Sequence, residues 1–220
     1  MKKAIILVSG GMDSCVTAAS AISDGHTPAF LHMNYGQKTE KRELKAFHDI
    51  VNHYKAKEKL VVDISHLSDI GGSCLTDSQI DVPNANLENS DIPVSYVPFR
   101  NANILSAAVS WAEILKATAI YIGAVEEDSS GYPDCRRSFF DAFESVIDNG
   151  TKPKTNIKIA TPLIALSKKE IIEKGISLDA PLHLTWSCYQ NDDVPCRECD
   201  SCALRSRGFE LAGITDPILL

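Results

Sequence analysis

The sequence lacks the features that place a protein in a membrane or on a large nucleic-acid surface. It has no run that approaches the about 20 consecutive apolar residues of a membrane-spanning helix. Basic residues are few, because 22 lysines and arginines stand against 29 aspartates and glutamates, for a formal net charge of −7. Extensive nucleic-acid binding needs a basic face. We therefore expect neither a membrane nor a nucleic acid among the partners.

A secretory signal is also missing. Two lysines precede an apolar run at residues 4–8, but this run is shorter than the about 7–15 apolar residues of a signal peptide. We therefore expect a cytoplasmic protein. Disulfides are rare in that compartment, so the seven cysteines are predicted to be free thiols or metal ligands. A length of 220 residues with 44% hydrophobic content suits a single domain over 1–220.

Two familiar phosphate-binding loops do not occur in the chain. It has neither the G-x-x-x-x-G-K-[ST] pattern of a Walker A site nor the G-x-G-x-x-G pattern of a dinucleotide-binding turn. It has instead S-G-G-M-D-S at 9–14, between an apolar strand at 4–8 and a helix at 15–24. Glycines at a helix N-terminus let backbone N–H groups face an anion. The carboxylate of Asp13 repels phosphates unless a cation bridges them, which predicts Mg²⁺. The alternative is a tight turn in which Asp13 or Ser14 only caps the helix.

Short apolar runs and helical patterns alternate along the rest of the chain. This alternation is typical of an α/β fold with a doubly wound parallel sheet. One segment, 65–98, is rich in Ser, Asp, Asn and Pro and interrupts the alternation, and we interpret it as a flap over the active site. The predicted strands lie at 4–8, 28–33, 59–64, 118–125 and 157–162, and the predicted helices at 15–24, 38–55, 102–116, 138–148 and 168–175.

Polar residues follow the predicted strands and indicate the site, because ligands of open α/β sheets bind at the carboxyl ends of the strands. Tyr35 and Gln37 lie in the loop 34–38 after the second strand, which is otherwise a simple connection to the next helix. Arg100 and Asn101 begin a helix, where an arginine suits a phosphate or a carboxylate. The alternative for Arg100 is a surface arginine at a helix start.

The loop 126–136 follows the fourth strand and combines acids, an aromatic ring and a thiol. Carboxylates there are suited to accept hydrogen bonds from the N1–H and exocyclic amine of a guanine-like base, and Tyr132 offers a stacking face. The alternative is a solvated acidic turn. Cys135 has no cysteine neighbour and no obvious histidine base, so we do not predict a nucleophile there. Lys168, next to a capping box that begins at Ser167, either reaches a phosphate or faces solvent.

Four cysteines near the C-terminus have the spacing of a metal site. They form a C-x₇-C-x₂-C-x₂-C pattern, and four thiolates complete a tetrahedral zinc site. The segment 186–207 has too few apolar residues to fold alone, so we predict one structural Zn²⁺ per chain. An iron–sulfur cluster is the competing interpretation, and zinc is favoured because the fourth ligand lies upstream of the clustered three. The predicted ligands are Cys188, Cys196, Cys199 and Cys202.

The S-G-G-M-D-S turn resembles the PP-loop of the N-type ATP pyrophosphatases. This turn, the G-Y-P-D-C-R run at 131–136 and the four-cysteine tail occur together and in order. From about residue 5 to about residue 207, the chain resembles the 7-cyano-7-deazaguanine synthase family. The resemblance implies a PP-loop type of adenine-nucleotide-binding fold, a C–N bond-forming ligase, and cleavage of ATP between its α- and β-phosphates. The implied reaction converts 7-carboxy-7-deazaguanine and ammonia to 7-cyano-7-deazaguanine for queuosine biosynthesis, by adenylating the carboxylate and then the amide.

The residues and the resemblance together assign roles in the site. The resemblance also implies a homodimer. Free ammonia is expected as the source of nitrogen, because no glutaminase domain is present. We predict that ATP is held by Val8, Ser9, Gly10, Gly11, Met12, Asp13, Ser14 and Cys15. We predict catalytic roles for Ser9, Asp13, Ser14, Arg100 and Lys168. We predict contacts to the deazaguanine substrate from Tyr35, Gln37, Arg100, Asn101, Tyr132, Asp134 and Arg136.

The chain departs from the family pattern at one position of this site. The family commonly has V-P-G-R-N where this chain has V-P-F-R-N at 97–101. A phenylalanine at position 99 cannot use the backbone regions that are open to glycine alone. We therefore expect that the loop differs here, or that the position does not require those regions.

Two other functions are compatible with a PP-loop. A tRNA-thiolating enzyme would need a basic RNA-binding face and catalytic cysteines near the nucleotide, which the net charge of −7 and the confinement of the cysteine cluster to the tail disfavour. A non-catalytic adenine-nucleotide sensor would need neither the 131–136 run nor the cysteine tail. It would bind ATP without releasing pyrophosphate.

Overall fold

A computed structural model describes residues 2–87, 91–126 and 131–219 of the chain. Its centre is a five-stranded sheet in the order β3-β2-β1-β4-β5, and all neighbouring strands are parallel. The register places Ile5 between Ala29 and Ile120. The predicted doubly wound α/β fold is thus confirmed. The strands are β1 (Lys3–Leu7), β2 (Thr27–Asn34), β3 (Glu58–Asp63), β4 (Ala119–Tyr121) and β5 (Lys158–Ala160).

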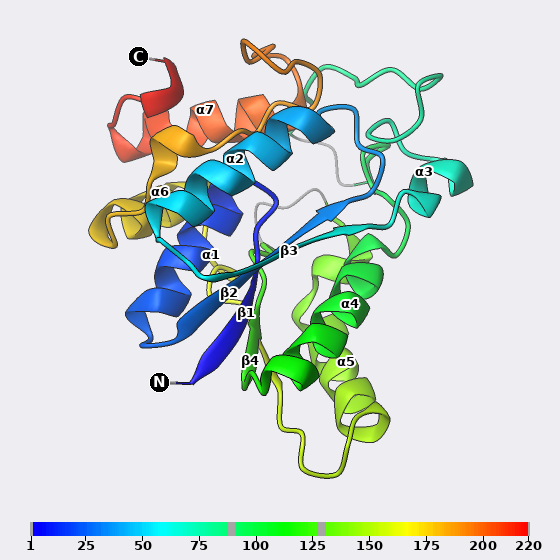
Figure 1. Ribbon diagram of the computed structural model, residues 1–220. Helices are drawn as coiled ribbons and strands as arrows, with labels where there is room; N and C mark the ends of the chain where they lie inside the picture. Colours follow the sequence, from blue (N-terminus) through cyan, green and yellow to red (C-terminus); the bar gives the residue numbers. More distant parts are fainter. Residues whose placement is uncertain (1, 88–90, 127–130, 220) are drawn as a thin grey trace.

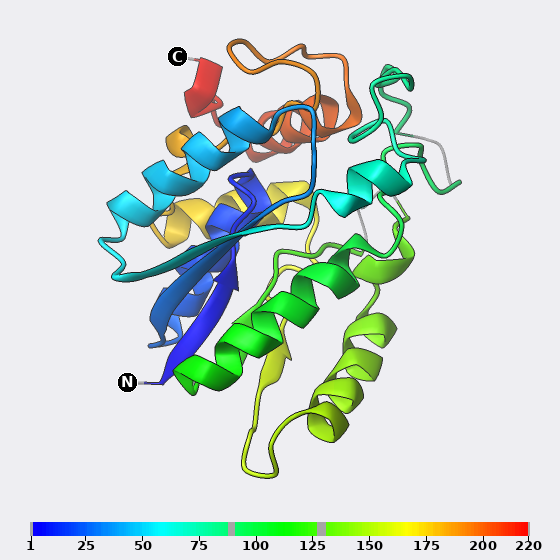
Figure 2. The same ribbon diagram turned by 45° about the vertical axis from the view of Figure 1, so that its right-hand side comes forward.

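Helices cover both faces of this sheet (Figures 1 and 2). On one face, α1 (Met12–Ser23) and α2 (Glu40–His53) pack on a core that includes Phe30 and Phe47. On the other face, α4 (Arg100–Leu115) and α5 (Arg137–Gly150) pack on a core with Leu105 and Phe140. The strands alternate between these cores, as a sheet buried on both faces requires. The remaining helices are α3 (His66–Ile70), α6 (Lys168–Ser177) and α7 (Asp200–Ala212), with short 3-10 turns at Pro133–Cys135, Leu182–Leu184 and Pro217–Leu219.

Two predicted helix boundaries are wrong for identifiable reasons. The first helix begins at Met12 rather than at residue 15, because Gly11 is already its N-cap and accepts the N–H of Cys15 at 3.1 Å. The helix α6 continues past Gly175 to Ser177. Gly175 does not end this helix. It allows close packing, because a Cβ there would lie 2.8 Å from Cγ2 of Val16 in α1.

The segment 65–98 packs partly into the body of the molecule. It contains α3, and its Leu75 and Val97 are buried with Tyr35. Farther along, the N–H of Ala85 donates to the carbonyl oxygen of Glu198 at 2.7 Å. The segment is therefore attached to the cysteine-rich tail, whereas its interpretation as a mobile flap stays a prediction, and residues 88–90 lie outside the described ranges.

The helices themselves give no indication of a membrane span. Within the described ranges, none of them combines the length and the apolar character that crossing a bilayer requires.

Candidate active site

The S-G-G-M-D-S turn connects β1 to α1 in the geometry of an anion site. Gly10 has φ +97°, and a Cβ there would lie 2.6 Å from the carbonyl oxygen of Glu43, so the position requires glycine. The hydroxyl of Ser14 donates to the carbonyl oxygen of Gly11 at 2.9 Å, and the hydroxyl of Ser9 donates to that of Ser14 at 3.2 Å. Since Met12 is the first helical residue, the N–H groups of the first turn point toward the turn and are available to a phosphate.

Asp13 and Lys168 form an ion pair beside this turn. The Nζ of Lys168 lies 2.7 Å from Oδ2 of Asp13, and both side chains are mostly shielded from solvent. The second carboxylate oxygen, Oδ1, is buried and has no hydrogen-bond partner among the described residues. Because a buried carboxylate oxygen without a donor is costly, this atom is suited to a cation. The geometry therefore fits the predicted Mg²⁺, with Lys168 available to a phosphate oxygen.

A cavity opens from the turn across the carboxyl ends of the strands. Its floor near the turn includes Val8, Ser9, Gly11 and residues 12–14, whereas Gly10 and Cys15 do not line it. The side chain of Cys15 is buried in the sheet core, which raises its pKa to about 12. One side of the cavity is apolar and is formed by Leu7, Leu31, Met33, Ile104 and Ile122.

The opposite side of the cavity is polar and aromatic. Nη1 of Arg100 donates to the hydroxyl oxygen of Tyr35 at 3.2 Å, and its guanidinium also lies 5.1 Å from the centre of the Tyr35 ring. Tyr132 lines the same side, and its hydroxyl donates to Oγ of Ser95 at 2.9 Å. The structure thus brings together three of the predicted substrate residues, two aromatic rings and one cation, on one side of the cavity.

The other predicted substrate residues line the cavity, lie behind its wall or lie away from it. Asn101 lines the cavity, and its N–H donates to Oδ2 of Asp134 at 2.9 Å. Asp134 is buried and does not line the cavity, and its burial raises the pKa of its carboxyl group. Gln37 is buried behind the wall, where it accepts the N–H of Tyr35 at 2.9 Å. Arg136 is exposed and away from the lining. Residues 127–130 of the predicted acidic loop lie outside the described ranges.

Phe99 lies in the left-handed backbone region just before α4. It has φ 58° and ψ 24°, and its N–H donates to the hydroxyl oxygen of Tyr96 at 3.0 Å. This region is costly for a side chain with a Cβ but is not closed to it. Position 99 therefore does not require a backbone region that is open to glycine alone, which is the second of the two expectations, and α4 begins at Arg100 as its next residue.

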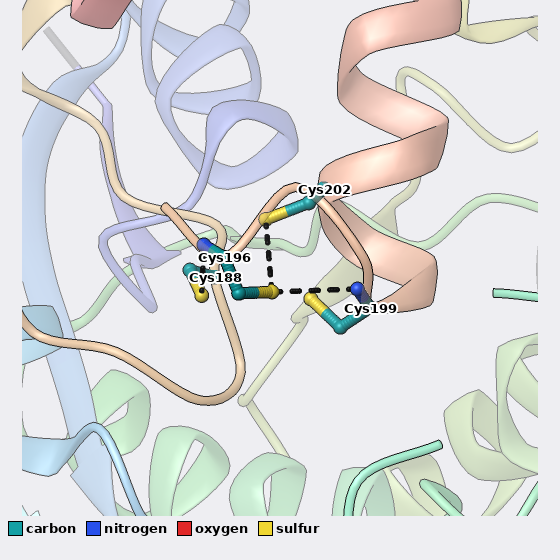
Figure 3. Close-up of side chains that lie close together, drawn as sticks. All are labelled: Cys188, Cys196, Cys199 and Cys202. Carbon is teal, nitrogen blue, oxygen red and sulfur yellow. Dashed lines mark hydrogen bonds between the residues drawn. The ribbon is translucent and has the colours of Figure 1, made fainter. Parts of the chain in front are cut away.

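The four predicted metal ligands lie together at the start of α7 (Figure 3). Their four sulfur atoms are all within 4.8 Å of one another, and those of Cys196 and Cys202 are 3.9 Å apart. A tetrahedral site with Zn–S bonds of 2.3 Å places its sulfurs about 3.8 Å apart. Backbone N–H groups also donate to the sulfurs, among them those of Asn191 to Cys188 and of Cys199 to Cys196. Such donors favour thiolates, so the cluster is able to hold a zinc ion.

The tail that carries these cysteines also forms a wall of the cavity. The N–H of Trp186 donates to the carbonyl oxygen of Gly10 at 2.9 Å, which joins the tail to the phosphate turn. Ser187 and Tyr189, on either side of the ligand Cys188, line the cavity. The metal segment is therefore part of the site.

Several residues of this cavity were not predicted from the sequence, among them Tyr189, Arg205 and Glu43. Tyr189 carries a detectable signal, because it adjoins a predicted metal ligand. Arg205 forms a buried ion pair with Asp216, at 2.6 and 2.8 Å, which braces the wall. Glu43 lies in the first turn of an otherwise ordinary amphipathic helix, and nothing local distinguishes it.

Comparison with known proteins agrees with this geometry. The family model described as "Queuosine biosynthesis protein QueC" matches residues 3–213. This chain belongs to the QueC family. A 7-cyano-7-deazaguanine synthase from Chlorobium chlorochromatii is 58% identical over 216 residues, covering 98% of this chain and 95% of that protein. One from Chlorobaculum parvum is 56% identical with the same coverage of both chains.

Comparison with solved structures identifies proteins with a similar fold. The NMN synthetase of Francisella tularensis has a TM-score of 0.51 at 15% identity, over 97% of this chain and 78% of that one. A 4-thiouridine synthetase in complex with RNA and ATP has a TM-score of 0.50 at 16% identity, over 96% of this chain and 50% of that one. At these identities the likeness shows a shared fold alone.

Proposed function

We propose that this QueC-family chain converts 7-carboxy-7-deazaguanine and ammonia to 7-cyano-7-deazaguanine with ATP, as the names of its relatives suggest. The observation that carries the proposal is a single cavity that joins an anion-binding turn to a polar, aromatic chamber containing Arg100. An aryl carboxylate does not react with ammonia at neutral pH unless its oxygen becomes a leaving group. Adenylation provides that leaving group.

The residues of the phosphate turn are assigned to ATP. The N–H groups of 12–14, with the hydroxyls of Ser9 and Ser14, are donors for the β- and γ-phosphates. Lys168 is released from Asp13 to a phosphate oxygen as the nucleotide binds. Magnesium, when bound, supplies charge neutralisation between the phosphates and the carboxylate of Asp13. The apolar side of the cavity suits the adenine ring.

The chemistry of the substrate then rests on position and charge. The carboxylate attacks the α-phosphorus of ATP, which forms an acyl adenylate and releases pyrophosphate. Ammonia displaces AMP to give the amide. The amide oxygen then attacks the α-phosphorus of a second ATP with release of pyrophosphate, and it leaves as AMP while the nitrogen loses two protons, which gives the nitrile. Among the described cavity residues, Cys135 is the thiol, and burial raises its pKa to about 11. It therefore stays protonated, which agrees with a reaction that needs no enzyme nucleophile.

The remaining parts of the proposal concern the metal and the assembly. We assign one structural Zn²⁺ to Cys188, Cys196, Cys199 and Cys202. A cytoplasmic setting suits these unpaired thiols, because the described residues contain no disulfide. A homodimer is also proposed. Exposed apolar side chains suit its contact, namely Phe99 at the N-cap of α4, Ile114 on α4 and Val146 on α5. Light scattering tests the dimer.

A turnover assay tests the proposed reaction. Zinc-replete protein is given ATP, Mg²⁺, ammonium and 7-carboxy-7-deazaguanine, with nucleotides followed by chromatography and the base by mass spectrometry. We expect the nitrile together with AMP and pyrophosphate. Binding of ATP without cleavage would contradict the proposal and favour a nucleotide sensor. Release of AMP without nitrile would retain the adenylation and point to a different acid.

A further inference from the structure

Glu43 is a cavity residue to which the proposed reaction has assigned no role. It lies in the first turn of α2 and lines the polar side of the cavity with Tyr35 and Arg100. Its carboxylate is held in place, because Oε1 accepts from the hydroxyl of Thr39 at 2.8 Å and Oε2 accepts from Nε2 of Gln37 at 3.2 Å. Glu43 as a whole is half-buried, and it is one of the residues that line the cavity.

Chemistry and position distinguish Glu43 from the other acids near the site. Among the described residues that line the cavity, Asp13 and Glu43 carry carboxylates. Asp13 is paired with Lys168 at the phosphate turn. Asp134 lies behind the wall, where its carboxylate accepts the N–H of Asn101. Glu43 alone of these three faces the aromatic chamber.

We propose that Glu43 is the carboxylate that recognises the guanine-like edge of the substrate, accepting hydrogen bonds from its N1–H and exocyclic amine. Two adjacent N–H donors match the two oxygens of one carboxylate. The inference rests on the proposed function, because it takes the deazaguanine acid as the substrate.

The surroundings of Glu43 support this assignment. Its carboxyl has a pKa raised to about 7, chiefly by burial, while the hydrogen bonds from Thr39 and Gln37 and the charge of Arg100 favour the ionised form. Burial thus makes ionisation of this carboxyl unfavourable, and two further hydrogen-bond donors from a substrate would stabilise its ionised form. Arg100 offers donors to the O6 atom that adjoins N1–H in a guanine-like ring. The rings of Tyr35 and Tyr132 offer stacking faces.

Recognition of the exocyclic amine is testable with a substrate analogue that lacks this amine. We expect the wild-type enzyme to prefer the natural acid over the 2-deamino acid by about 100-fold or more in kcat/KM, since a site built for a donor leaves its acceptor unpaired with the analogue. In Glu43→Gln, KM for the natural acid is expected to rise about tenfold or more, and the preference over the analogue to fall to within about fivefold. The KM for ATP is expected to stay within about twofold.

Glu113→Gln is the matched control. Glu113 lies on α4 outside the cavity, and its carboxylate accepts from Thr155 and from a backbone N–H, as that of Glu43 accepts from two donors. It is expected to retain wild-type kinetics. If the wild-type enzyme has the same kcat/KM for the natural acid and the 2-deamino acid, the proposal is overturned, and no variant is needed to show it. A Glu43→Gln protein that keeps the preference, or that loses ATP and acid binding equally, overturns it as well. If the wild-type enzyme does not convert the acid at all, the proposed function fails and this inference with it.

Discussion

The carboxyl group of Glu43 is expected to make binding of the acid depend on pH. Only the ionised form accepts two hydrogen bonds, and its pKa in the folded protein is about 7. As the pH falls from 8 to 6, KM for the deazaguanine acid should therefore rise about tenfold, while KM for ATP changes little. The charged and titratable groups that face this carboxyl are Arg100, Asp192 and Tyr35. Steady-state kinetics of wild type and Glu43→Gln measure the effect, and an equally steep variant profile would assign the pKa elsewhere.

The same group links stability to pH. The pKa of Glu43 is raised above the ordinary value of 4.5 by burial, so its stabilising contribution is fully present below about pH 4.5 and is lost as the pH rises through 7. Glutamine does not ionise. The melting temperature of Glu43→Gln relative to wild type should therefore increase between pH 5 and pH 8. A constant difference over that range would argue against a buried ionising carboxyl.

Phe99 is expected to lower the stability of the protein because of its left-handed backbone. Replacing Phe99 with glycine, the residue common in the family, removes a strain of about 1–2 kcal/mol. Two effects offset part of this gain in stability: glycine has a greater conformational entropy in the unfolded chain, and the edge contact of the Phe99 ring to Phe139 is lost. We expect a net gain of about 0.5–1 kcal/mol, or about 2 °C in melting temperature, measured by calorimetry. Lys116→Gly is the control for backbone strain alone. Lys116 also has a left-handed backbone, with φ 54°, at the other end of α4, and its replacement by glycine removes no aromatic ring. A less stable Phe99→Gly beside a more stable Lys116→Gly would show that the ring contact outweighs the strain.

At the residue scale, the sequence predicted those parts of the site whose geometry is local. The phosphate turn spans six neighbouring residues and the cysteine pattern has short spacings, so each carries its shape within a few residues. Glu43 was missed because the packing of α2 on the phosphate turn, which brings it to the cavity, is not local, and Asp134 was misplaced because its partner is distant. The carbonyl of Glu43 packs on Gly10, and Asp134 binds Asn101 from 33 positions away.

At the scale of elements, Gly123 sets how closely the end of β4 approaches α1. A Cβ at Gly123 would lie 2.9 Å from Oγ1 of Thr17 and 3.0 Å from the carbonyl oxygen of Asp13. Backbone atoms of the first turn cannot give way cheaply, so Gly123→Ala should displace the turn that binds the phosphates. We expect a loss of about 1–3 kcal/mol in stability and at least about a tenfold loss in kcat/KM for ATP.

The control for that substitution is Gly150→Ala. Gly150 is the last residue of α5, and a Cβ there meets nothing within 4 Å. Alanine is expected to be neutral or slightly stabilising at this position. Equal effects of the two substitutions on ATP kinetics would contradict the close-approach argument. The boundaries of the predicted elements were mostly right to within a few residues, and the largest error fell at the end of β4, which was predicted at residue 125 and lies at Tyr121.

At the scale of the whole molecule, the metal segment should control the shape of the cavity. Removal of zinc by a chelator is expected to release Trp186, which is buried beside the cluster, and to lower the melting temperature by about 10 °C. A red shift of Trp186 emission, in a Trp111→Phe background that leaves one tryptophan, measures the release. Zinc added back should reverse it. Unchanged Trp186 emission in metal-free protein would mean that this wall of the cavity keeps its structure without the ion.

The hydrogen bond between Trp186 and Gly10 has a consequence for the order in which the enzyme becomes competent. The phosphate turn precedes the wall that closes its cavity along the chain, so it leaves the ribosome well before that wall. A nascent chain therefore carries an exposed glycine-rich turn until the tail is made, with the cavity still open on one side. Because this contact joins distant parts of the chain and completes the cavity, a chain that lacks the tail is able to fold much of its sheet and yet has an incomplete site.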